Sequence, residues 1–473
     1  MQLGDILDTY TLDVATAQIE IHDVQIDSRE CTPGSLFFAL NGANLRGATF
    51  VEQAAINGAV AIVTTELVEL EGFDLPVFLV TESQIRPLLA HASAAVCGYP
   101  EVDVQLVGVT GTNGKTSVTT LVSQLAKALG WNSGNIGTLT SVRTTPDSPE
   151  LFRTLRTLRE GFTNDSAQSV VAMEVSSHAL HQGRVTGLEF EIAAFTNLSH
   201  DHLDYHHTME EYFEVKAQLF STDHAKKAVV WADDDYGQRL IERSLIPTIA
   251  VSRTDASEVR DSLLGTTFFW REKLINSPLV GGYNVDNTLM ALTIVSELGA
   301  TDEEIALAMA GLSPVPGRFE VLKGVDRRVV VDYAHTPDGL QRLLTDVRSL
   351  AEGGRVITVF GCGGDRDQSK RPAMGRIASE LSDIAIITSD NPRSESPDAI
   401  IEEVASGVVS GSTVMLQSDR RAAISEALTI CEVNDVVVIA GKGHESQQII
   451  GDQIVEFDDR EVALQLMKRG LDA

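Results

Sequence analysis

A glycine-rich loop followed by a lysine and two hydroxyl residues is the part of this sequence best suited to chemistry. It runs Gly108-Val-Thr-Gly111-Thr-Asn-Gly114-Lys115-Thr116-Ser117. Backbone N–H groups of such a loop bind phosphate together with the N-terminus of a following helix. Lys115 would reach the β and γ phosphates, and the Thr116 hydroxyl would take one coordination position on Mg²⁺. Although Val109 stands where the GxxxxGK[ST] pattern has its first glycine, the loop predicts an ATP site.

Carboxylates and histidines form two further clusters, each after a run of apolar residues. Glu174 lies in the segment MEVSSH, and the segment FTNLSHDHLDYH contributes Asp201, His202 and Asp204. Doubly wound sheets usually bind ligands where their strands end. Taken alone, an Asp/His cluster is more often a polar loop, but its place after an ATP-binding strand favours a metal site. Mg²⁺ prefers oxygen ligands, which Glu174 and Thr116 could supply.

Strands and helices must position these residues, and the apolar periodicity predicts where they lie. Residues 102–110, VDVQLVGVT, are typical of a buried strand, and apolar residues recur at helical spacing from Val118 to Leu129. Further buried strands are predicted at 170–175, 191–198 and 228–232. The segments between them are long enough for helical crossovers, so a largely parallel sheet is expected.

Two Pro- and Gly-containing breaks divide the chain, near Gly98-Tyr99-Pro100 and near 313–317. We therefore predict an α/β protein of three domains, over residues 1–99, 100–313 and 314–473. The first contains short β-like runs such as SLFFAL and AVAIVTT. In the third, strands are predicted at 356–360, 384–388 and 436–440, and helices at 371–381 and 419–428.

The amino-acid composition of the chain argues against some classes of function. The formal net charge of −30 argues against general nucleic-acid binding, because that binding depends on Lys and Arg neutralising phosphates. The four cysteines form no CxxC pair, so reduced and mostly buried thiols are expected. No export signal and no apolar run of about 18 residues is present, which favours a cytoplasmic protein without membrane insertion. A monomer is expected.

Many long, ordered motifs extend this picture over nearly the whole chain: TGTNGKTS, MEVSSHAL, FTNLSHDHLDYH, YFEVKAQLF, GGYNVDN, PVPGRFE, VVVDYAHTPD, FGCGGDRDQSKRPAMG, SDNPRSE and GKGHE. Together they closely resemble the Mur ligase family. The resemblance implies a nucleotide-sugar-binding N-terminal domain, a central P-loop ATPase domain with a mainly parallel sheet, and a Rossmann-like C-terminal domain that binds the incoming amino acid.

The resemblance also implies an activity. Members of the family add amino acids to a UDP-N-acetylmuramoyl peptide in the synthesis of the cytoplasmic peptidoglycan precursor, and so serve cell shape and division. The pattern is most similar to members that add meso-2,6-diaminopimelate to UDP-N-acetylmuramoyl-L-alanyl-D-glutamate. ATP is then a cosubstrate that converts the side-chain carboxylate of D-Glu to an acyl phosphate, with Mg²⁺ as cofactor.

Roles for residues around ATP follow from the motif matches. One Mg²⁺ would be held through Thr116 and Glu174, and a second through His202 and a carbamylated Lys216. Carbamylation would turn the cationic lysine into an anion of carboxylate type. The expected catalytic set is Lys115, Glu174, His202 and Lys216. The residues expected to bind ATP are Gly111, Thr112, Asn113, Gly114, Lys115, Thr116, Ser117, Asn284, Asn287, Arg318 and Asp332.

Two further sets would bind the other substrates. Contacts to the UDP-muramoyl dipeptide are expected from Ser28, Thr144, Thr145, Ser176, Gln182 and Arg184. Contacts to diaminopimelate are expected from Arg371, Asp390, Asn391, Pro392, Arg393, Gly441 and Glu445, with Glu445 facing the distal ammonium. Arg393 decides the amino acid, because diaminopimelate carries a carboxylate that lysine lacks and a guanidinium binds it bidentately.

Four alternatives remain at this point. The same chemistry could use L-lysine as the added amino acid. A folate polyglutamate ligase shares the GTNGK loop, but the DNPR and GKGHE segments argue against it. A P-loop phosphotransferase or nucleotide-driven switch would hydrolyse ATP without an amide product. A catalytically dead binding module is disfavoured, because the four expected catalytic residues are all present.

Overall fold

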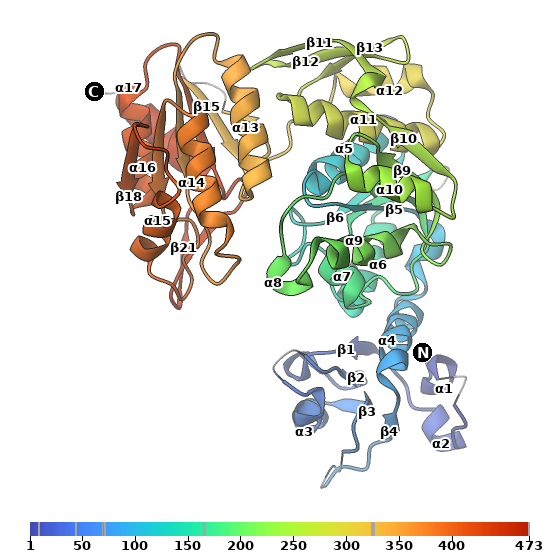
Figure 1. Ribbon diagram of the computed structural model, residues 1–473. Coiled ribbons are helices and arrows are strands. Elements are labelled where there is room, and N and C mark those ends of the chain that lie inside the picture. The colour runs from blue at the N-terminus through green and yellow to red at the C-terminus, as the bar shows by residue number, and fades with distance from the viewer. Residues whose placement is uncertain are drawn as a thin grey trace.

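Three α/β bodies follow one another along the chain (Figure 1). The computed structural model describes residues 1–7, 10–42, 45–68, 70, 72–163, 167–322 and 327–471. Each body contains its own mainly or wholly parallel sheet, so the expected α/β class is confirmed. The predicted domain boundaries remain predictions. Short 3₁₀ helices also occur in the described residues, among them η1 (Ser28–Glu30), η2 (Gly47–Phe50), η3 (Pro100–Asp103), η4 (Gln218–Phe220) and η5 (Arg253–Asp255).

The N-terminal body is built on a four-stranded parallel sheet of order β1-β2-β3-β4. Its elements are α1 (Leu3–Ile6), α2 (Val14–Ala17), β1 (Asp23–Gln25), β2 (Ser35–Ala39), α3 (Val51–Ile56), β3 (Ala59–Thr64), β4 (Val77–Leu79) and α4 (Glu82–Cys97). Strands β2 and β3 fall in the β-like runs that the sequence predicts. A capping box at Thr81 begins α4, and Gly98 ends it in the left-handed conformation that glycine adopts without strain.

Helix α4 joins the first body to the second (Figure 1). Ile85 and Leu89 pack into the apolar core beneath the N-terminal sheet. Ala90 and Ala94 instead belong to a core cluster of the central body. Because one helix buries residues in both cores, α4 fixes the N-terminal body against the central one.

The central body contains a six-stranded parallel sheet of order β10-β9-β8-β5-β7-β6. Its elements are β5 (Gln105–Thr110), α5 (Lys115–Ala128), β6 (Asn132–Ile136), α6 (Ser148–Glu160), β7 (Ser169–Glu174), α7 (Ser177–His181), β8 (Phe190–Phe195), α8 (Leu203–His206), α9 (Met209–Ala217), β9 (Ala225–Trp231), α10 (Asp235–Arg243) and β10 (Thr248–Val251). Helices α5 and α11 share a core cluster with strand residues on one face of the sheet, and α6 and α9 share another on the opposite face.

Strand β8 ends three residues before the predicted end at 198, and this difference matters for the site. Thr196 and Asn197 leave the sheet because their side chains bond to the glycine-rich loop. Thr196 Oγ1 donates to Asn113 O at 2.6 Å, and Asn197 Oδ1 accepts from Asn113 N at 3.0 Å. The apolar run ends at Phe195, where the strand also ends, whereas the prediction extends it over two polar residues to Leu198.

A three-stranded antiparallel sheet and two helices complete the central part of the chain. They are β11 (Ala256–Ser262), β12 (Gly265–Trp270), β13 (Lys273–Ser277), α11 (Gly282–Glu297) and α12 (Asp302–Met309). The sequence analysis did not predict this sheet. In Figure 1 it lies at the top of the molecule, beside the crossing to the C-terminal body.

The C-terminal body has a six-stranded sheet of order β14-β15-β19-β16-β17-β18, parallel except for β14. Its elements are β14 (Glu320–Val321), β15 (Arg328–Asp332), α13 (Pro337–Leu350), β16 (Val356–Phe360), α14 (Lys370–Leu381), β17 (Ile384–Thr388), α15 (Pro397–Ala405), β18 (Val414–Gln417), α16 (Arg420–Ile430), β19 (Val436–Ala440), β20 (Gln447–Ile450), β21 (Gln453–Glu456) and α17 (Asp459–Leu471). The three predicted strands match β16, β17 and β19 residue for residue. The two predicted helices match α14 and α16 to within two residues.

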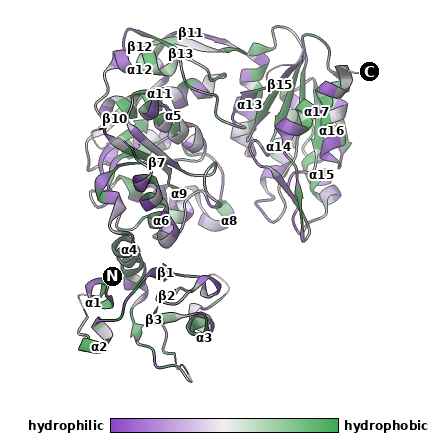
Figure 2. Cartoon of the chain, turned by 180° about the vertical axis from the view of Figure 1, so that it is seen from behind, coloured by the Kyte–Doolittle hydropathy of each residue, from purple (hydrophilic) through white to green (hydrophobic). Residues whose placement is uncertain are grey.

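Apolar residues concentrate in the strands and the inner helix faces (Figure 2). The central and C-terminal sheets are covered on both faces, which explains why their strands are continuous apolar runs rather than alternating ones. All four cysteines are buried and free, as expected. Among the described residues, no helix is both long and apolar enough to cross a bilayer.

Candidate active site

A cavity of about 600 Å³ is lined by residues of the central and C-terminal bodies. Strand ends and the loops after them supply much of the lining, as expected for parallel sheets. The predicted site residues that line it are Thr112, Asn113, Gly114, Lys115, Thr116, Thr144, Thr145, Glu174, Ser176, Arg184, His202, Arg318, Asp390, Asn391, Arg393, Gly441 and Glu445. We call this cavity the cleft. It brings together residues from all three predicted substrate sets.

The glycine-rich loop connects β5 to α5, as the sequence predicts. Gly111 and Gly114 have φ values of 144° and 87°, which side-chain-bearing residues rarely adopt. A Cβ on Gly111 would lie 2.0 Å from Thr196 Oγ1, and one on Gly114 would lie 2.4 Å from Asn287 Oδ1. Both positions therefore require glycine for conformation and for space.

Two lysines meet at this loop, Lys115, which is half-buried and lines the cleft, and Lys216, which is buried. Lys115 Nζ donates to Gly111 O and Thr112 O, both at 2.9 Å. Lys216 Nζ, from α9, donates to the same Gly111 O at 3.0 Å and to Thr110 Oγ1 at 3.3 Å. Burial lowers the pKa of Lys115, and burial together with the Lys115 charge lowers the pKa of Lys216 well below its usual value. The lowered pKa makes the neutral amine of Lys216 more accessible, and the neutral amine is the form that reacts with CO₂.

Glu174 and Thr116 provide hard oxygen ligands on the wall of the cleft. Glu174 ends β7 and is almost fully buried, and its Oε1 accepts from Thr138 N at 2.8 Å. The Thr116 hydroxyl accepts from Arg318 Nη2 at 2.9 Å. A buried carboxylate and a hydroxyl beside a phosphate loop fit Mg²⁺ in ligand chemistry.

His202 and Asp201 lie together at the start of α8. His202 adopts a φ of 55°, which is uncommon for a residue with a side chain and is found more often at functional sites. Its Nε2 lies 3.4 Å from Asp201 Oδ2. Burial lowers the His202 pKa despite this carboxylate, so its imidazole is neutral and able to ligate a metal.

The second expected metal position is incomplete without modification. Within the described part of the chain, no group of three or more His, Cys, Asp and Glu side chains is arranged to hold a metal ion. The unmodified Lys216 side chain donates to Gly111 O and Thr110 Oγ1 and supplies no oxygen ligand for a cation. A carbamate on Lys216 would add the missing oxygen ligands beside His202, so the residues fit the metal only in the modified form.

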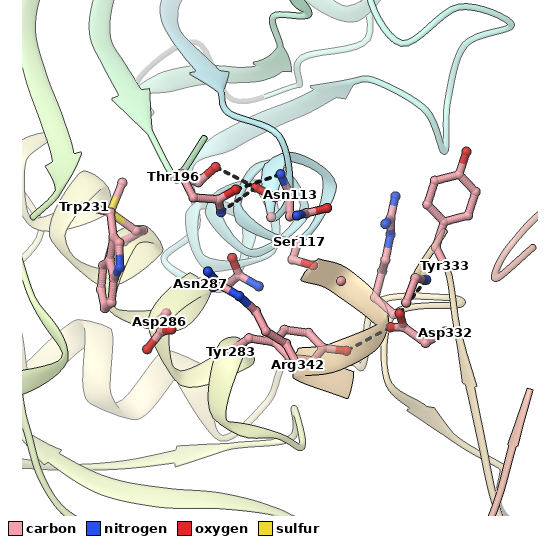
Figure 3. Close-up of a pocket in the computed structure, with 16 residues that line it drawn as sticks. Asn113, Ser117, Thr196, Trp231, Tyr283, Asp286, Asn287, Asp332, Tyr333 and Arg342 are labelled. Carbon is pink, nitrogen blue, oxygen red and sulfur yellow. Dashed lines mark hydrogen bonds between the residues drawn. The ribbon is translucent and has the colours of Figure 1, made fainter. Parts of the chain in front are cut away.

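A second pocket adjoins the loop and is shown in Figure 3. Asn287 lines it, together with Asn113, Gly114, Ser117, Arg318 and Asp332 from the predicted ATP set. Asn284 does not line it; its amide donates to Val280 O at 2.8 Å and its oxygen accepts from Asn287. Asn284 therefore orients Asn287 in this structure. Four further residues that were not among the predicted site residues also line the pocket: Trp231, Tyr283, Asp286 and Arg342.

Asp332 and Arg318 link this pocket to the C-terminal body. Asp332 accepts from Tyr283 Oη at 2.9 Å and from Phe319 N at 2.6 Å. The Arg318 guanidinium lies 4.3 Å from the centre of the Tyr333 ring. Burial raises the pKa of Asp332, while Arg318 and the backbone N–H groups oppose the shift. The PGRF segment therefore contributes to the predicted ATP site, because Arg318 donates to Thr116 at the phosphate loop.

Most of the residues expected to contact the UDP-muramoyl dipeptide lie near each other. Thr145 Oγ1 donates to Glu174 O at 2.8 Å and lies 3.3 Å from Ser176 Oγ. Arg184 donates to Thr145 O and to Gln182 Oε1. Ser28 lies instead in η1 of the N-terminal body and does not line the cleft.

Residues expected to bind diaminopimelate divide into two groups. Asp390, Asn391, Arg393, Gly441 and Glu445 line the cleft. Asn391 Nδ2 donates to Glu445 Oε2 at 2.8 Å, and burial with the Asp390 charge raises the pKa of Glu445. Pro392 and Arg371 do not line the cleft. The Arg371 guanidinium is fully buried between Glu395 and Glu403, both within 2.9 Å, so it stabilises the loops here.

Further charged residues line the cleft without having been predicted. His335, Arg366, Asp367 and Lys370 come from the C-terminal body. Their motifs, YAHTPD and GCGGDRDQSKRP, were part of the family resemblance, so the signal was present but no role was attached to it. Burial and the nearby Lys370 lower the pKa of His335 to about 4.

Comparison with known proteins agrees with this geometry. Residues 20–104, 109–295 and 317–443 match, in turn, the Mur ligase family catalytic domain, the Mur ligase middle domain and the Mur ligase glutamate ligase domain. A protein of Gloeobacter violaceus named UDP-N-acetylmuramoyl-L-alanyl-D-glutamate–2,6-diaminopimelate ligase is 41% identical, over 99% of this chain and 98% of its own.

Two solved structures are also similar. One, described under the same ligase name, has a TM-score of 0.68 and 30% identity, covering 100% of this chain and 99% of its own. The other, a MurF ligase from Thermotoga maritima in complex with ADP, has a TM-score of 0.66 at 19% identity and covers 95% of this chain and 98% of its own. The second likeness shows a shared fold.

Proposed function

The chain belongs to the Mur ligase family, and we propose that it is the cytoplasmic ATP-dependent ligase that adds meso-2,6-diaminopimelate to UDP-N-acetylmuramoyl-L-alanyl-D-glutamate. One observation carries the proposal: a single cleft is lined both by the phosphate loop with Lys115 and Glu174 and, on the other body, by Arg393. A nucleotide switch requires only the first group. A ligase requires both, because the activated acid and the amine must meet.

Activation of the acid is the first step. A side-chain carboxylate oxygen of D-Glu attacks the γ-phosphorus of ATP, the bond to the bridging oxygen breaks, and ADP leaves with that electron pair. Charge on the transferred phosphoryl group must be neutralised throughout. Lys115, which bonds to the loop, and Arg318, which donates to Thr116, are the cations that would do this.

Amide formation is the second step. The diaminopimelate amine attacks the acyl carbon of the mixed anhydride, giving a tetrahedral intermediate. The carbon–oxygen bond to phosphate then breaks, the amine loses a proton, and amide and inorganic phosphate form. Holding acid and amine together in one enclosed cleft supplies the proximity that this bimolecular step needs.

Mg²⁺ would be held by Thr116 and Glu174 at one position and by His202 with carbamylated Lys216 at the other. When bound, it supplies charge neutralisation to the phosphoryl oxygens. The lowered pKa of Lys216 favours carbamylation by making the neutral amine accessible, and Asp201 beside His202 orients the imidazole.

Selection of diaminopimelate over lysine rests on Arg393. Its Nη1 donates to Gly364 O at 2.7 Å, which leaves further N–H groups of the guanidinium for a carboxylate. Its backbone is held on both sides by the β20–β21 hairpin, through Arg393 N to Ile449 O and Gly451 N to Arg393 O. Lysine would leave this arginine without a partner, which penalises it.

The proposal is tested by incubating the protein with ATP, Mg²⁺, UDP-N-acetylmuramoyl-L-alanyl-D-glutamate and either meso-diaminopimelate or L-lysine. The mass of the product is then measured by mass spectrometry. We expect a tripeptide product with diaminopimelate and stoichiometric ADP. A product formed with lysine alone would overturn the specificity, and ADP released without any amide would overturn the ligase assignment.

A further inference from the structure

Asp147 is the meeting point of three arginines that come from different segments. Arg86 Nη1, on α4, lies 3.5 Å from Asp147 Oδ1, and Arg184 Nε lies 3.3 Å from the same oxygen. Arg143 pairs with the other oxygen, Oδ2. The carboxylate is buried, and no role for it follows from the family motifs used above.

The Asp147 carboxylate does not cap the helix that follows it. Asp147 is the N-cap residue of α6, with extended backbone, yet its side chain accepts no hydrogen bond from the first turn of that helix. An N-cap Asp ordinarily accepts such a bond and stabilises its helix by about 1 kcal/mol. The side chain turns to the arginines instead, so the ion cluster is the arrangement that this fold favours.

The cluster carries more positive than negative charge. Among the residues that the structure describes, three guanidinium groups share this one carboxylate, an excess of two positive charges. Burial lowers the pKa of Arg184, and the charges of Arg143 and Arg86 lower it further, while Asp147 opposes them. Such a group of cations is stabilised by an added anion.

The surplus charge faces the cleft. Arg143 and Arg184 both line it, next to Thr144 and Thr145, whereas Asp147 does not. Arg143 has a half-exposed side chain, and Asp147 is the only partner for it that the described residues supply. Arg184 is fixed further by Gln182 and by Thr145 O.

We propose that Asp147 is a positioning residue that holds Arg143 and Arg184 toward the cleft as a two-arginine site for an anionic group of the UDP-muramoyl dipeptide. This inference rests on the proposed function for the identity of the ligand. In this arrangement Arg143 contacts the anionic group of the substrate. Asp147 acts through the two arginines and does not touch the substrate. The anionic group is either the diphosphate or a carboxylate of the dipeptide, which share the chemistry that guanidinium recognises.

Binding of UDP-N-acetylmuramoyl-L-alanyl-D-glutamate and of UDP alone is measured by calorimetry, with no turnover required, for the wild type and for Asp147→Asn, Asp147→Glu and Arg143→Ala. KM for this substrate, KM for ATP and kcat are measured on the same proteins. Asp435→Asn is the matched control, because it removes another buried carboxylate paired with an arginine, Arg355 at 2.6 Å, away from the cleft.

We expect Asp147→Asn and Arg143→Ala each to weaken dipeptide binding and raise its KM by about tenfold, the effect of losing a charge-assisted contact. KM for ATP should not change, and Asp147→Glu should recover most of the affinity. Asp435→Asn should lower thermal stability without changing either KM. Weaker binding of UDP alone would identify the diphosphate as the anion, and unchanged UDP binding would identify a carboxylate.

The inference is overturned if Asp147→Asn leaves dipeptide binding unchanged, or if it raises KM for ATP equally, since that indicates a general folding defect. Failure of the proposed function is a separate result: the wild type would then bind no dipeptide at all, or would form no amide from it.

Discussion

Lys115 and Lys216 donate to the same carbonyl oxygen, Gly111 O, in the phosphate loop. Burial lowers the pKa of Lys216, and repulsion from the nearby Lys115 charge lowers it further. Loss of the proton from Lys216 relieves this repulsion. Lys115 can then serve the phosphates, while Lys216 is free to carry a carbamate.

Replacing Lys216 tests this division of roles. We expect Lys216→Ala to lower kcat by at least about 100-fold, because a group that stabilises developing phosphoryl charge is lost. The wild-type protein equilibrated with ¹³C-bicarbonate should show a carbamate carbon by NMR, and Lys216→Ala should lack it. An active variant, or a carbamate signal that persists in it, would contradict the assignment.

Replacing Arg393 tests the amino-acid specificity. We expect Arg393→Ala to raise KM for meso-diaminopimelate by about 10- to 100-fold, because a charge-assisted bidentate contact contributes roughly 1.5–3 kcal/mol. KM for ATP should stay unchanged, and discrimination against L-lysine should fall. An equal loss for ATP and diaminopimelate would indicate damage to the fold instead.

At the scale of elements, the site is built where parallel strands end. Strand β5 leads into the phosphate loop, β7 ends at Glu174, and the segment after β8 supplies Thr196, Asn197 and His202. The apolar runs predicted these strands because both faces of each sheet are covered. Because the strands are parallel, their carboxyl ends lie at one edge of the sheet. The convergence of the loops that follow these strands was therefore predictable from sequence.

Other elements were not predictable in the same way. The antiparallel strands β11–β13 have few consecutive apolar residues, and β11 is largely exposed. The pairing of Asn284 with Val280 O and of Arg371 with Glu395 and Glu403 is a tertiary outcome. Sequence motifs assign residue types to a site, but they do not show which of those side chains reach the cavity and which hold their neighbours in place.

Helix α11 of the central body is contacted by a carboxylate of the C-terminal body, Asp346, whose pKa is raised. No side chain of its own caps it, and Asp346 on α13 accepts from Tyr283 N at 3.2 Å in its first turn. Burial, together with Asp261 and Asp286 nearby, raises the pKa of Asp346 from 3.8 to about 6. Between about pH 4 and pH 6 the folded chain therefore keeps a proton that the unfolded chain releases, so the contribution of Asp346 to stability falls as pH rises.

Asp346→Asn isolates this effect, since the amide oxygen can still accept from the helix but does not titrate. We expect the free energy of unfolding of the variant, relative to the wild type, to rise across that pH interval and to level off above it. Denaturant titrations at a series of pH values measure the difference. Parallel curves for the two proteins would show that Asp346 is not shifted in this way.

At the scale of the whole molecule, one cleft lies between the central and C-terminal bodies, and α4 joins the N-terminal body to the central one. The phosphate loop and the predicted amino-acid site thus lie on different bodies, and both line the cleft. The account depends on this arrangement, because the acid must be phosphorylated at one wall and attacked by an amine held at the other.

The central claim, activation of a carboxylate as an acyl phosphate, is tested most directly by an isotope transfer. UDP-N-acetylmuramoyl-L-alanyl-D-glutamate labelled with ¹⁸O in the side-chain carboxylate is converted with ATP and meso-diaminopimelate, and the released phosphate is analysed by ³¹P NMR or mass spectrometry. Because the attacking carboxylate oxygen leaves with the phosphoryl group, the account predicts one ¹⁸O atom in each phosphate formed. Amide formation with unlabelled phosphate would contradict it.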